Sequence, residues 1–320
     1  MADLATTYMG LSLASPLVVA ASSVSNMIDR IEKVEANGAG AVVIRSLFEE
    51  QAFHDDPDFD LGSIHAAYFP TLEQSGVKDH LQWTERTRQQ VKLPLIGSLN
   101  CVQPASWVRY AQALESTGVN ALELNFYRVE TSVERSGAEI EQELLDTVAA
   151  VHQAVKLPIA VKLSPYHTSV AHIAHQLAER GVAGLVLFNR FLQPDIQLDD
   201  LTLHSDMFLS SPEEIRLPLR WTAILYGRVQ AELALNTGVH SGLDAVKAIL
   251  AGAQVVQVAS ALLRNGLGYL ETIRNELKSW METHEYGHLD EFRGKLSQMH
   301  YPHPQTFERA QYVNLILRQH

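Results

Sequence analysis

Cysteine is nearly absent from the sequence, which has 320 residues and a single cysteine, Cys101. One cysteine excludes an internal disulfide framework and any metal site built from several thiolates. Basic residues are also few: the chain has 25 lysines and arginines and 37 acidic residues, which gives a net charge of -12. Nucleic acids and anionic membrane surfaces favour a basic protein face, so neither is an expected partner.

Long hydrophobic runs are lacking as well. No apolar run approaches the roughly 20 residues that a helix needs to cross a bilayer. The N-terminus shows no basic region followed by an apolar core and a small-residue cleavage site, so no signal peptide is expected. Together with the single cysteine, these absences predict a cytoplasmic protein. The chain is 46% hydrophobic, which suffices for one large core or two small ones.

Short apolar runs recur along the chain and alternate with helical patterns. The runs are continuously apolar, which is typical of buried parallel strands, whereas a half-exposed antiparallel strand alternates. Several helical stretches end at or near a glycine, as in "STGVNAL" and "ERGVAGL", and a capping glycine that feeds a short loop explains this. The eight expected strands are residues 16–22, 41–46, 94–100, 121–126, 158–164, 184–189, 231–238 and 253–260. The clearest helical stretches between them are residues 29–37, 105–117, 139–155, 170–180 and 244–251.

These repeated units predict an α/β fold, a (β/α)8 TIM barrel of about 250 residues plus insertions. An open doubly wound sheet is the alternative, ranked lower because eight units close more naturally than they lie open. The barrel is expected to occupy residues 1–298, followed by a tail at 299–320 with an amphipathic helix at 305–318 for packing or an oligomer contact. Long insertions at 47–76 and 190–219 follow the second and sixth strands, on the side where barrel active sites lie. We expect these loops to act as lids or substrate walls.

Polar side chains stand at the C-terminal ends of the expected strands, which meet at one mouth of a barrel. Amides both donate and accept hydrogen bonds, so several asparagines there suit a planar heterocycle such as a flavin or a pyrimidine. Taken singly, each asparagine is better explained as a loop-start residue or a helix cap. The strand-end residues are Arg45, Ser46, Ser98, Asn100, Glu123, Asn125, Lys162, Ser164 and Asn189.

Lys162 ends an otherwise buried strand, "PIAVKLS", and a buried lysine needs a partner. Three explanations stay open: a structural ion pair, the Schiff-base lysine of a lyase or aldolase, and a cation that faces an anionic cofactor such as reduced flavin. The asparagines around it disfavour the lyase, because aldolase sites place acids near the lysine.

The loops after the last two strands have the composition of a phosphate site. Residues 235–242, "LNTGVHSG", and 258–266, "VASALLRNG", follow the seventh and eighth strands, where many barrels bind phosphate. Gly238 frees the backbone to approach an anion, and Ser260 can cap the next helix.

Several stretches in combination resemble the dihydroorotate dehydrogenase family, most closely divergent members of its soluble class 1 branch. They are "PIAVKLSPY", "GLVLFNR", "LRWTAILYGR", "NTGVHSGLDAVKAILAGAQVVQVASALL" and "EFRGKLSQ", within a similarity that covers residues 8–298. The resemblance implies an FMN-binding barrel that oxidises a CH–CH bond of a small cyclic substrate, or reduces the corresponding C=C bond. It also implies a homodimer.

The resemblance assigns roles by position. Asn125 matches the asparagine that opens the family's cysteine loop, Lys162 the lysine near the flavin pyrimidine edge, and Asn189 the asparagine after the sixth strand. His65, Asn125 and Asn189 are the expected substrate contacts, and no metal is expected. The expected FMN contacts are Ala21, Ser22, Arg45, Ser46, Asn100, Asn125, Lys162, Asn189, Thr237, Gly238, Ala259 and Ser260.

The chain departs from the family at its catalytic loop. Arg128 stands where the class 1 base cysteine belongs, and arginine cannot act as a base near neutral pH. The family's substrate loop is replaced by "HAAYFPT", residues 65–71, and Thr237 replaces the first of two adjacent glycines. FMN binding is therefore the expectation, whereas dihydroorotate is not the expected substrate.

Tyr127, next to the missing cysteine, is the candidate for proton transfer, with a packing or lid aromatic as the equal alternative. The leading hypothesis is an FMN-dependent oxidoreductase with Tyr127 and Lys162 as catalytic residues. A flavin-binding barrel that has lost catalysis and serves binding or regulation is the second. A Schiff-base lyase on Lys162 is the third.

Overall fold

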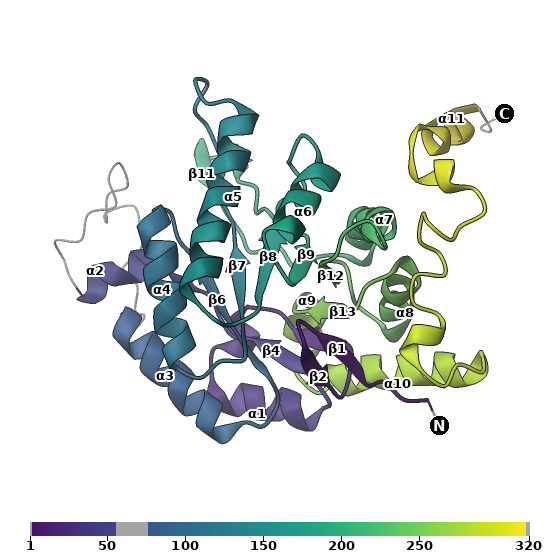
Figure 1. The fold of residues 1–320 in the computed structure, drawn as a ribbon, viewed down its shortest axis with the longest axis horizontal. Helices are drawn as coiled ribbons and strands as arrows, with labels where there is room; N and C mark the ends of the chain where they lie inside the picture. Colours follow the sequence, from purple (N-terminus) through teal and green to yellow (C-terminus); the bar gives the residue numbers. More distant parts are fainter. Residues whose placement is uncertain (1, 56–75, 318–320) are drawn as a thin grey trace.

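The computed structural model describes residues 2–55 and 76–317 and shows the expected (β/α)8 barrel (Figure 1). Its strands are parallel, and the pairing of β4 with β6 closes the ring. A short extra strand, β5 (Leu47–Phe48), continues the sheet beside β6. The barrel strands are β3 (Leu17–Val19), β4 (Ala41–Val43), β6 (Leu95–Asn100), β7 (Ala121–Asn125), β8 (Ile159–Leu163), β9 (Gly184–Leu187), β12 (Glu232–Asn236) and β13 (Val255–Val258).

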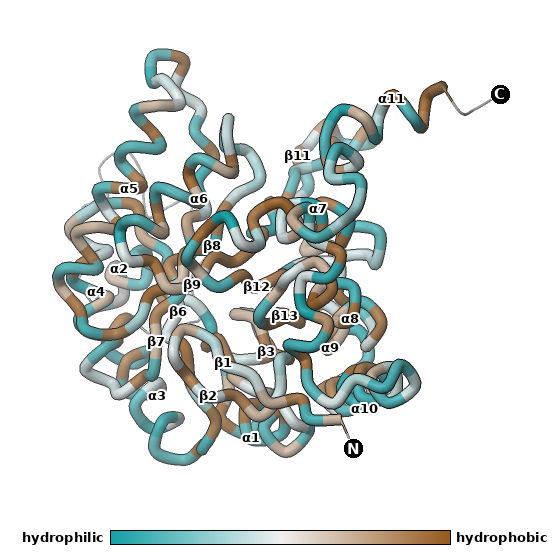
Figure 2. Tube along the Cα trace, turned by 45° about the vertical axis from the view of Figure 1, so that its right-hand side comes forward, coloured by the Kyte–Doolittle hydropathy of each residue, from teal (hydrophilic) through white to brown (hydrophobic). Residues whose placement is uncertain are grey.

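Helices surround the barrel and cover the outer faces of its strands (Figure 1). Along them teal and brown residues alternate in Figure 2, as expected for amphipathic helices that pack one face on a sheet. Each of the five helical stretches predicted between the strands is a helix, with ends within two residues of the expected bounds. The helices around the barrel are α1 (Ile28–Ala36), α3 (Val77–Gln90), α4 (Pro104–Ser116), α5 (Gly137–Ala154), α6 (Val170–Glu179), α7 (Arg216–Leu225), α8 (Gly242–Ala251), α9 (Ser260–Asn265) and α10 (Tyr269–Thr283).

The barrel interior is apolar at its N-terminal end. Because side chains alternate along a strand, the residues of equal parity face inward together. They form one cluster, to which every barrel strand contributes: Val18, Ala41, Val43, Ile96, Ala121, Ala160, Val186, Ala234 and Val255. Two residues further along several of these strands, the inward-facing side chains are polar rather than apolar. The candidate site begins at this polar layer, which contains Ser98, Glu123, Lys162, Asn236 and Gln257.

An antiparallel hairpin closes the N-terminal end of the barrel, and it was not predicted. Strands β1 (Thr6–Tyr8) and β2 (Leu11–Leu13) pair around a turn at Met9 and Gly10, both with positive φ. Tyr8, Met9 and Leu13 join the interior cluster. The hairpin therefore seals the end opposite the strand ends that carry the polar residues.

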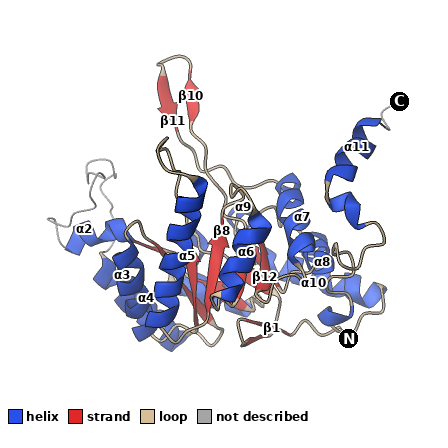
Figure 3. Ribbon diagram, turned by 45° about the horizontal axis from the view of Figure 1, so that its top comes forward, coloured by secondary structure: helices blue, strands red, loops and turns tan. Residues whose placement is uncertain are grey.

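Both long insertions contain structure of their own. After β5 the first insertion forms a 3-10 turn, η2 (Glu49–Gln51), and a short helix, α2 (Ala52–Asp55). The second contains a hairpin of β10 (Asp195–Gln197) and β11 (Thr202–His204), which projects from the barrel in Figure 3, and a 3-10 turn, η4 (Pro212–Ile215).

The C-terminal tail differs from the expectation. The helix predicted for residues 305–318 is a 3-10 turn, η6 (Pro304–Phe307), followed by α11 (Arg309–Leu317). None of the residues of α11 is buried, and the helix stands away from the barrel in Figures 1 and 2, so it does not pack as an amphipathic element. Within residues 2–55 and 76–317, no helix is long and apolar enough to span a bilayer.

Candidate active site

Two adjoining cavities lie at the C-terminal ends of the barrel strands. One has a volume of ≈ 240 Å³ and the other ≈ 690 Å³, and they share Ala21, Ser22, Ser23 and Met207 as lining residues. We call the smaller one the inner cavity and the larger one the outer cavity. Met207 comes from the second insertion, which thus supplies part of the wall.

The residues expected to contact FMN all line one of these cavities. The inner cavity is lined by Ala21, Ser22, Lys162, Asn189, Thr237, Gly238, Ala259 and Ser260. The outer cavity is lined by Ala21, Ser22, Arg45, Ser46, Asn100, Asn125 and also Tyr127. Residues far apart in the sequence are brought together because each follows a parallel strand of the same barrel.

The asparagines at the strand ends bind one another. Asn100 Nδ2 donates to the Asn125 backbone oxygen at 2.6 Å, and Asn189 Nδ2 donates to Asn125 Oδ1 at 2.5 Å. Within the described part of the chain, this leaves Asn125 Nδ2 and Asn189 Oδ1 available to a ligand. Asn100 thus holds the Asn125 backbone and Asn189 holds its side chain, so the Asn125 amide is oriented before a ligand arrives.

A buried charged layer lies beneath the asparagines. Lys162 Nζ is 3.9 Å from Glu123 Oε1 on the neighbouring strand, and both residues are buried. From the opposite wall, Gln257 Nε2 donates to Glu123 Oε2 at 2.6 Å. Of the three explanations for a buried lysine, the structure shows the ion pair, and it also places Lys162 against the inner cavity.

The loop after β12 has a conformation that glycine favours. Thr237 has a φ of 81° and Gly238 a φ of 79°. A Cβ on Gly238 would lie 2.2 Å from the backbone nitrogen of Ile215, so only glycine fits there. Thr237 stands in the left-handed region, which is unusual for a β-branched residue.

The second insertion reaches the loop after β13. Ser210 N donates to Ser260 Oγ at 3.0 Å, and the Ser210 hydroxyl lies 3.1 Å from His240 Nε2. Burial and the nearby Arg264 lower the pKa of His240, which favours its neutral form. Ser210 and Ser260 both line the inner cavity at this end, and His240 lies behind Ser210.

Arg128 and Cys101 lie away from the two cavities, whereas Tyr127 lines the outer cavity as well as a separate one. Arg128 forms ion pairs with Glu143 at 3.0 Å and Glu130 at 3.2 Å, and lines a separate cavity of ≈ 100 Å³. Cys101 lines that separate cavity too, and burial raises the pKa of its thiol, so it is not a reactive thiolate. The Tyr127 ring stacks on Phe191 at 4.4 Å.

His65 and the rest of residues 65–71 lie outside the described residues. Two lining residues were missed although their strand parity pointed to them: Asn236 follows Ala234, and Gln257 follows Val255, on inward-facing positions. Ser210 was missed as well. It lies in the second insertion, fifty residues before its partner Ser260, and no sequence pattern marks it as a site residue.

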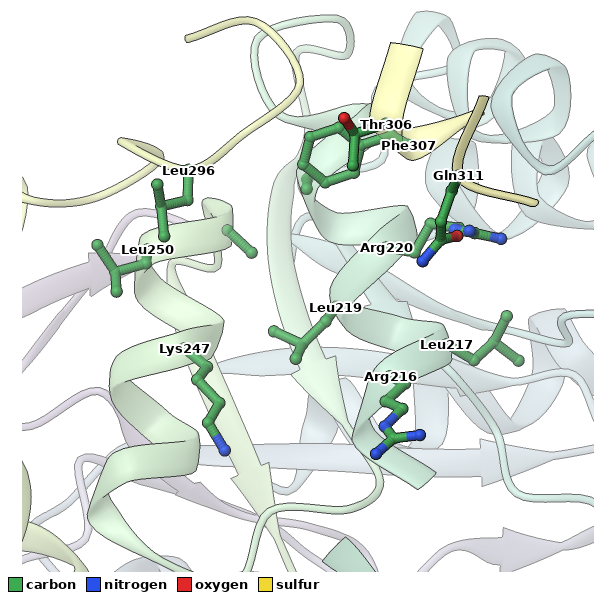
Figure 4. Close-up of a pocket in the computed structure, with 12 residues that line it drawn as sticks. Arg216, Leu217, Leu219, Arg220, Lys247, Leu250, Leu296, Thr306, Phe307 and Gln311 are labelled. Carbon is green, nitrogen blue, oxygen red and sulfur yellow. The ribbon is translucent and has the colours of Figure 1, made fainter. Parts of the chain in front are cut away.

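A cavity outside the barrel contains none of the predicted site residues. It has a volume of ≈ 580 Å³ and lies between α7, α8 and the C-terminal segment (Figure 4). Leu219, Leu250 and Leu296 give it an apolar lining, with Arg216 and Arg220 on α7.

The arrangement suits a planar, hydrogen-bonding anionic ligand better than a metal. In residues 2–55 and 76–317, no group of three His, Cys, Asp or Glu side chains is placed to hold a metal ion. The cavities instead offer amides, hydroxyls, Lys162 and Arg45 around apolar walls. A cyclic molecule with carbonyl and N–H edges and a phosphate tail matches that set of donors.

The parallel strands and the polar, asparagine-rich mouth define a (β/α)8 barrel with a ligand site at its C-terminal strand ends. A family model described as "Dihydroorotate dehydrogenase" matches residues 3–281. The chain belongs to the dihydroorotate dehydrogenase family.

Relatives at low identity cover nearly all of the chain. The catalytic subunit of dihydroorotate dehydrogenase B (NAD(+)) from Methanothermobacter thermautotrophicus is 27% identical over 304 residues, 91% of this chain and 97% of that protein. The corresponding subunit from Thermoplasma volcanium is 25% identical over 305 residues, 92% of this chain and 98% of that protein. The chloroplastic dihydropyrimidine dehydrogenase (NADP(+)) of Arabidopsis thaliana is 23% identical over 340 residues, 96% of this chain and 80% of that protein.

Proposed function

We propose that this barrel binds FMN at its mouth and is an oxidoreductase that acts on a CH–CH or C=C bond of a small cyclic substrate. The observation that carries the proposal is the convergence of all expected FMN contacts on the inner and outer cavities. The names of the relatives, dihydroorotate and dihydropyrimidine dehydrogenases, support a pyrimidine-like substrate. When bound, FMN supplies hydride transfer through its isoalloxazine ring.

The residues of this chain hold and orient the partners. Lys162, kept in place by Glu123 and lining the inner cavity, would supply a positive charge to bound FMN and would stabilise negative charge on it. Asn125 and Asn189 offer an amide nitrogen and an amide oxygen to the substrate or the ring. Thr237, Gly238 and Ser260 line the same cavity and would hold the phosphate, with backbone N–H groups as donors.

Dihydroorotate is not the substrate that the site favours. The class 1 base is replaced by Arg128, whose guanidinium is held by two glutamates away from both cavities. This observation also supports a second candidate, an FMN-binding barrel without the family's catalysis. A catalytic role for Tyr127 stays a prediction, as does substrate contact by His65.

A direct experiment separates the two candidates. The protein is reconstituted with FMN, reduced anaerobically with dithionite, and mixed with orotate, uracil, fumarate or a quinone. Reoxidation by one of these compounds well above the buffer rate supports the oxidoreductase, whereas a flavin that none reoxidises supports the binding protein. A colourless protein with a borohydride-trapped adduct on Lys162 would contradict both and favour a lyase.

Oligomeric state belongs to the same proposal. We propose a homodimer, and exposed apolar residues of α11 support a contact between copies: Tyr312, Leu315, Ile316 and Leu317. Gln298 is buried while Met299 is half exposed, which supports a barrel unit that ends at 298. Sedimentation of the full chain and of a variant ending at residue 298 tests both points, because the shorter variant is expected to fold and to lose association.

A further inference from the structure

Tyr127, in the loop after β7, lines the outer cavity, whereas Arg128 lines neither the inner nor the outer cavity. Arg128 is bound by Glu130 and Glu143 and lines the separate cavity. The Tyr127 hydroxyl accepts a hydrogen bond from the Leu192 backbone nitrogen at 3.1 Å, at the exposed rim of the outer cavity. Another element also offers a candidate for the acid or base of the reaction.

Glu50, in the turn after β5, lines the outer cavity together with Asn100 and Asn125. Its Oε2 atom is buried and has no hydrogen-bond partner among the described residues. A buried carboxylate oxygen without a partner costs about 1–3 kcal/mol, and at a cavity wall such an oxygen is open to a ligand.

The adjacent residue, Glu49, differs from Glu50 because both of its carboxylate oxygens accept hydrogen bonds. Glu49 is fully buried, and its oxygens accept bonds from Val102 N at 2.6 Å, Gln103 N at 3.0 Å and the Ser106 hydroxyl at 2.5 Å. Those bonds fix the start of α4 to the turn. The Glu49 carboxylate is therefore fully occupied by structural hydrogen bonds, and these bonds hold the backbone from which Glu50 lines the cavity.

We propose that Glu50 is the catalytic acid–base residue of this site, a role that rests on the proposed oxidoreductase function. In the oxidative direction, a C–H bond of the substrate breaks, its proton passes to the Glu50 carboxylate, and its electron pair forms the C=C bond. FMN, when bound, would be the oxidant and would take the hydrogen of the neighbouring carbon as hydride. In the reductive direction, the Glu50 carboxyl group returns the proton.

The environment of Glu50 supports this assignment. Burial raises its pKa, its own backbone N–H opposes the rise, and the charge of Glu49 adds to it. A raised pKa moves a carboxyl group toward neutral pH, where proton exchange is most efficient. The other titratable groups around it are Arg45 at the end of β4, Cys101 after β6 and Tyr127 after β7, with Arg45 the one cation lining the outer cavity within the described residues.

The first arm of the test needs neither flavin nor substrate. An infrared titration of the unloaded protein follows the protonated carboxyl C=O band. The wild-type protein is expected to show a band that titrates above the usual range for glutamate. Because burial also raises the pKa of Glu232, the difference from wild type is what counts: Glu50→Gln should lose part of the band. Glu143→Gln, which changes a carboxylate of the separate cavity and serves as the matched control, should lose none of it. A band that Glu50→Gln leaves unchanged overturns the inference.

The second arm measures flavin reduction in FMN-loaded protein, with dihydroorotate and 5,6-dihydrouracil as probes. Glu50→Gln should bind FMN within about twofold of wild type but reduce it at least about 100-fold more slowly, with partial recovery in Glu50→Asp. The wild-type rate should rise with pH through the Glu50 ionisation, and the rate of Glu50→Gln should not. Tyr127→Phe is expected to lose less than about tenfold.

The outcomes separate the inference from the proposed function. Equal rates in Glu50→Gln and wild type overturn the role of Glu50 while leaving the oxidoreductase intact. Bound FMN that neither probe reduces in the wild type overturns the role of Glu50 and the catalytic half of the proposed function together. Failure to bind FMN contradicts the proposed function itself, whereas the infrared arm is unaffected by it.

Discussion

Lys162 and Glu123, on neighbouring strands of the barrel, form a buried ion pair in which Nζ lies 3.9 Å from Oε1. Gln257 holds the second oxygen of Glu123 from the opposite wall. The pair places one cation beneath the asparagine layer and against the inner cavity. Lys162 is therefore both part of the barrel's internal polar layer and the proposed contact with the flavin.

The first prediction separates these two roles. Lys162→Met leaves Glu123 buried without its counter-charge and should lower the free energy of unfolding by about 3–5 kcal/mol. The double variant Lys162→Met with Glu123→Gln removes both charges and should recover most of that loss, as measured by urea denaturation. Both variants should bind FMN more weakly than wild type. A double variant with restored stability and wild-type FMN affinity would show that Lys162 is structural only.

The second prediction concerns the left-handed threonine. Thr237→Gly should raise the free energy of unfolding by about 1 kcal/mol, because glycine adopts a φ of 81° without strain. FMN affinity should be unchanged or higher. Thr237→Ala keeps a Cβ at that φ and is the control, for which no gain is expected. Equal denaturation midpoints for the glycine and alanine variants would contradict the assignment of strain.

The third prediction tests the close approach at Gly238. Gly238→Ala should destabilise the protein by about 2 kcal/mol or more and weaken FMN binding, because its Cβ would clash with the Ile215 backbone. Gly266 also has a positive φ, 85°, but has open space around it, so Gly266→Ala carries the strain without the clash. A thermal melt in which both variants lose the same stability would rule out the close packing of this loop.

The fourth prediction is a pH dependence of stability. Burial, followed by the charge of Arg45, lowers the pKa of His80 in the folded protein to about 4, whereas an unfolded histidine titrates near 6.5. The unfolded chain therefore binds a proton first, and stability is lost as the pH falls from about 6.5 to about 4, by at most about 3 kcal/mol.

His80→Gln should remove that contribution to the slope. Urea denaturation of both proteins at several pH values measures it, and parallel pH profiles for wild type and variant would contradict the buried, neutral state of His80.

Much of the fold and half of the site were accessible from the sequence. Parallel strands are buried on both faces and read as apolar runs, so the strand positions and the order of the barrel followed from the runs alone. Because all such strands end at one mouth, Asn125, Lys162 and Asn189 could be placed together without knowing any distance.

Other structural features could not be predicted, because they depend on tertiary packing and leave no local sequence pattern. The bond from Gln257 to Glu123 crosses the barrel, and it exists because two side chain lengths match the barrel's width at that layer. The hairpin at the closed end turns at Met9 and Gly10. Asparagine or aspartate before a glycine is the usual sequence signal of such a turn, and methionine at that position gives no such signal. Glu50 was overlooked because a charged residue in an insertion ordinarily faces solvent.

The most direct test of the central claim is a titration of FMN into flavin-free protein, followed by quenching of flavin fluorescence. The wild-type protein is expected to bind one FMN per chain, and the double variant Lys162→Met with Glu123→Gln should bind it at least about tenfold more weakly while remaining folded. Binding of one FMN per chain that the double variant leaves unchanged would contradict the proposed place of the cofactor. No quenching by the folded wild-type protein would contradict the account as a whole.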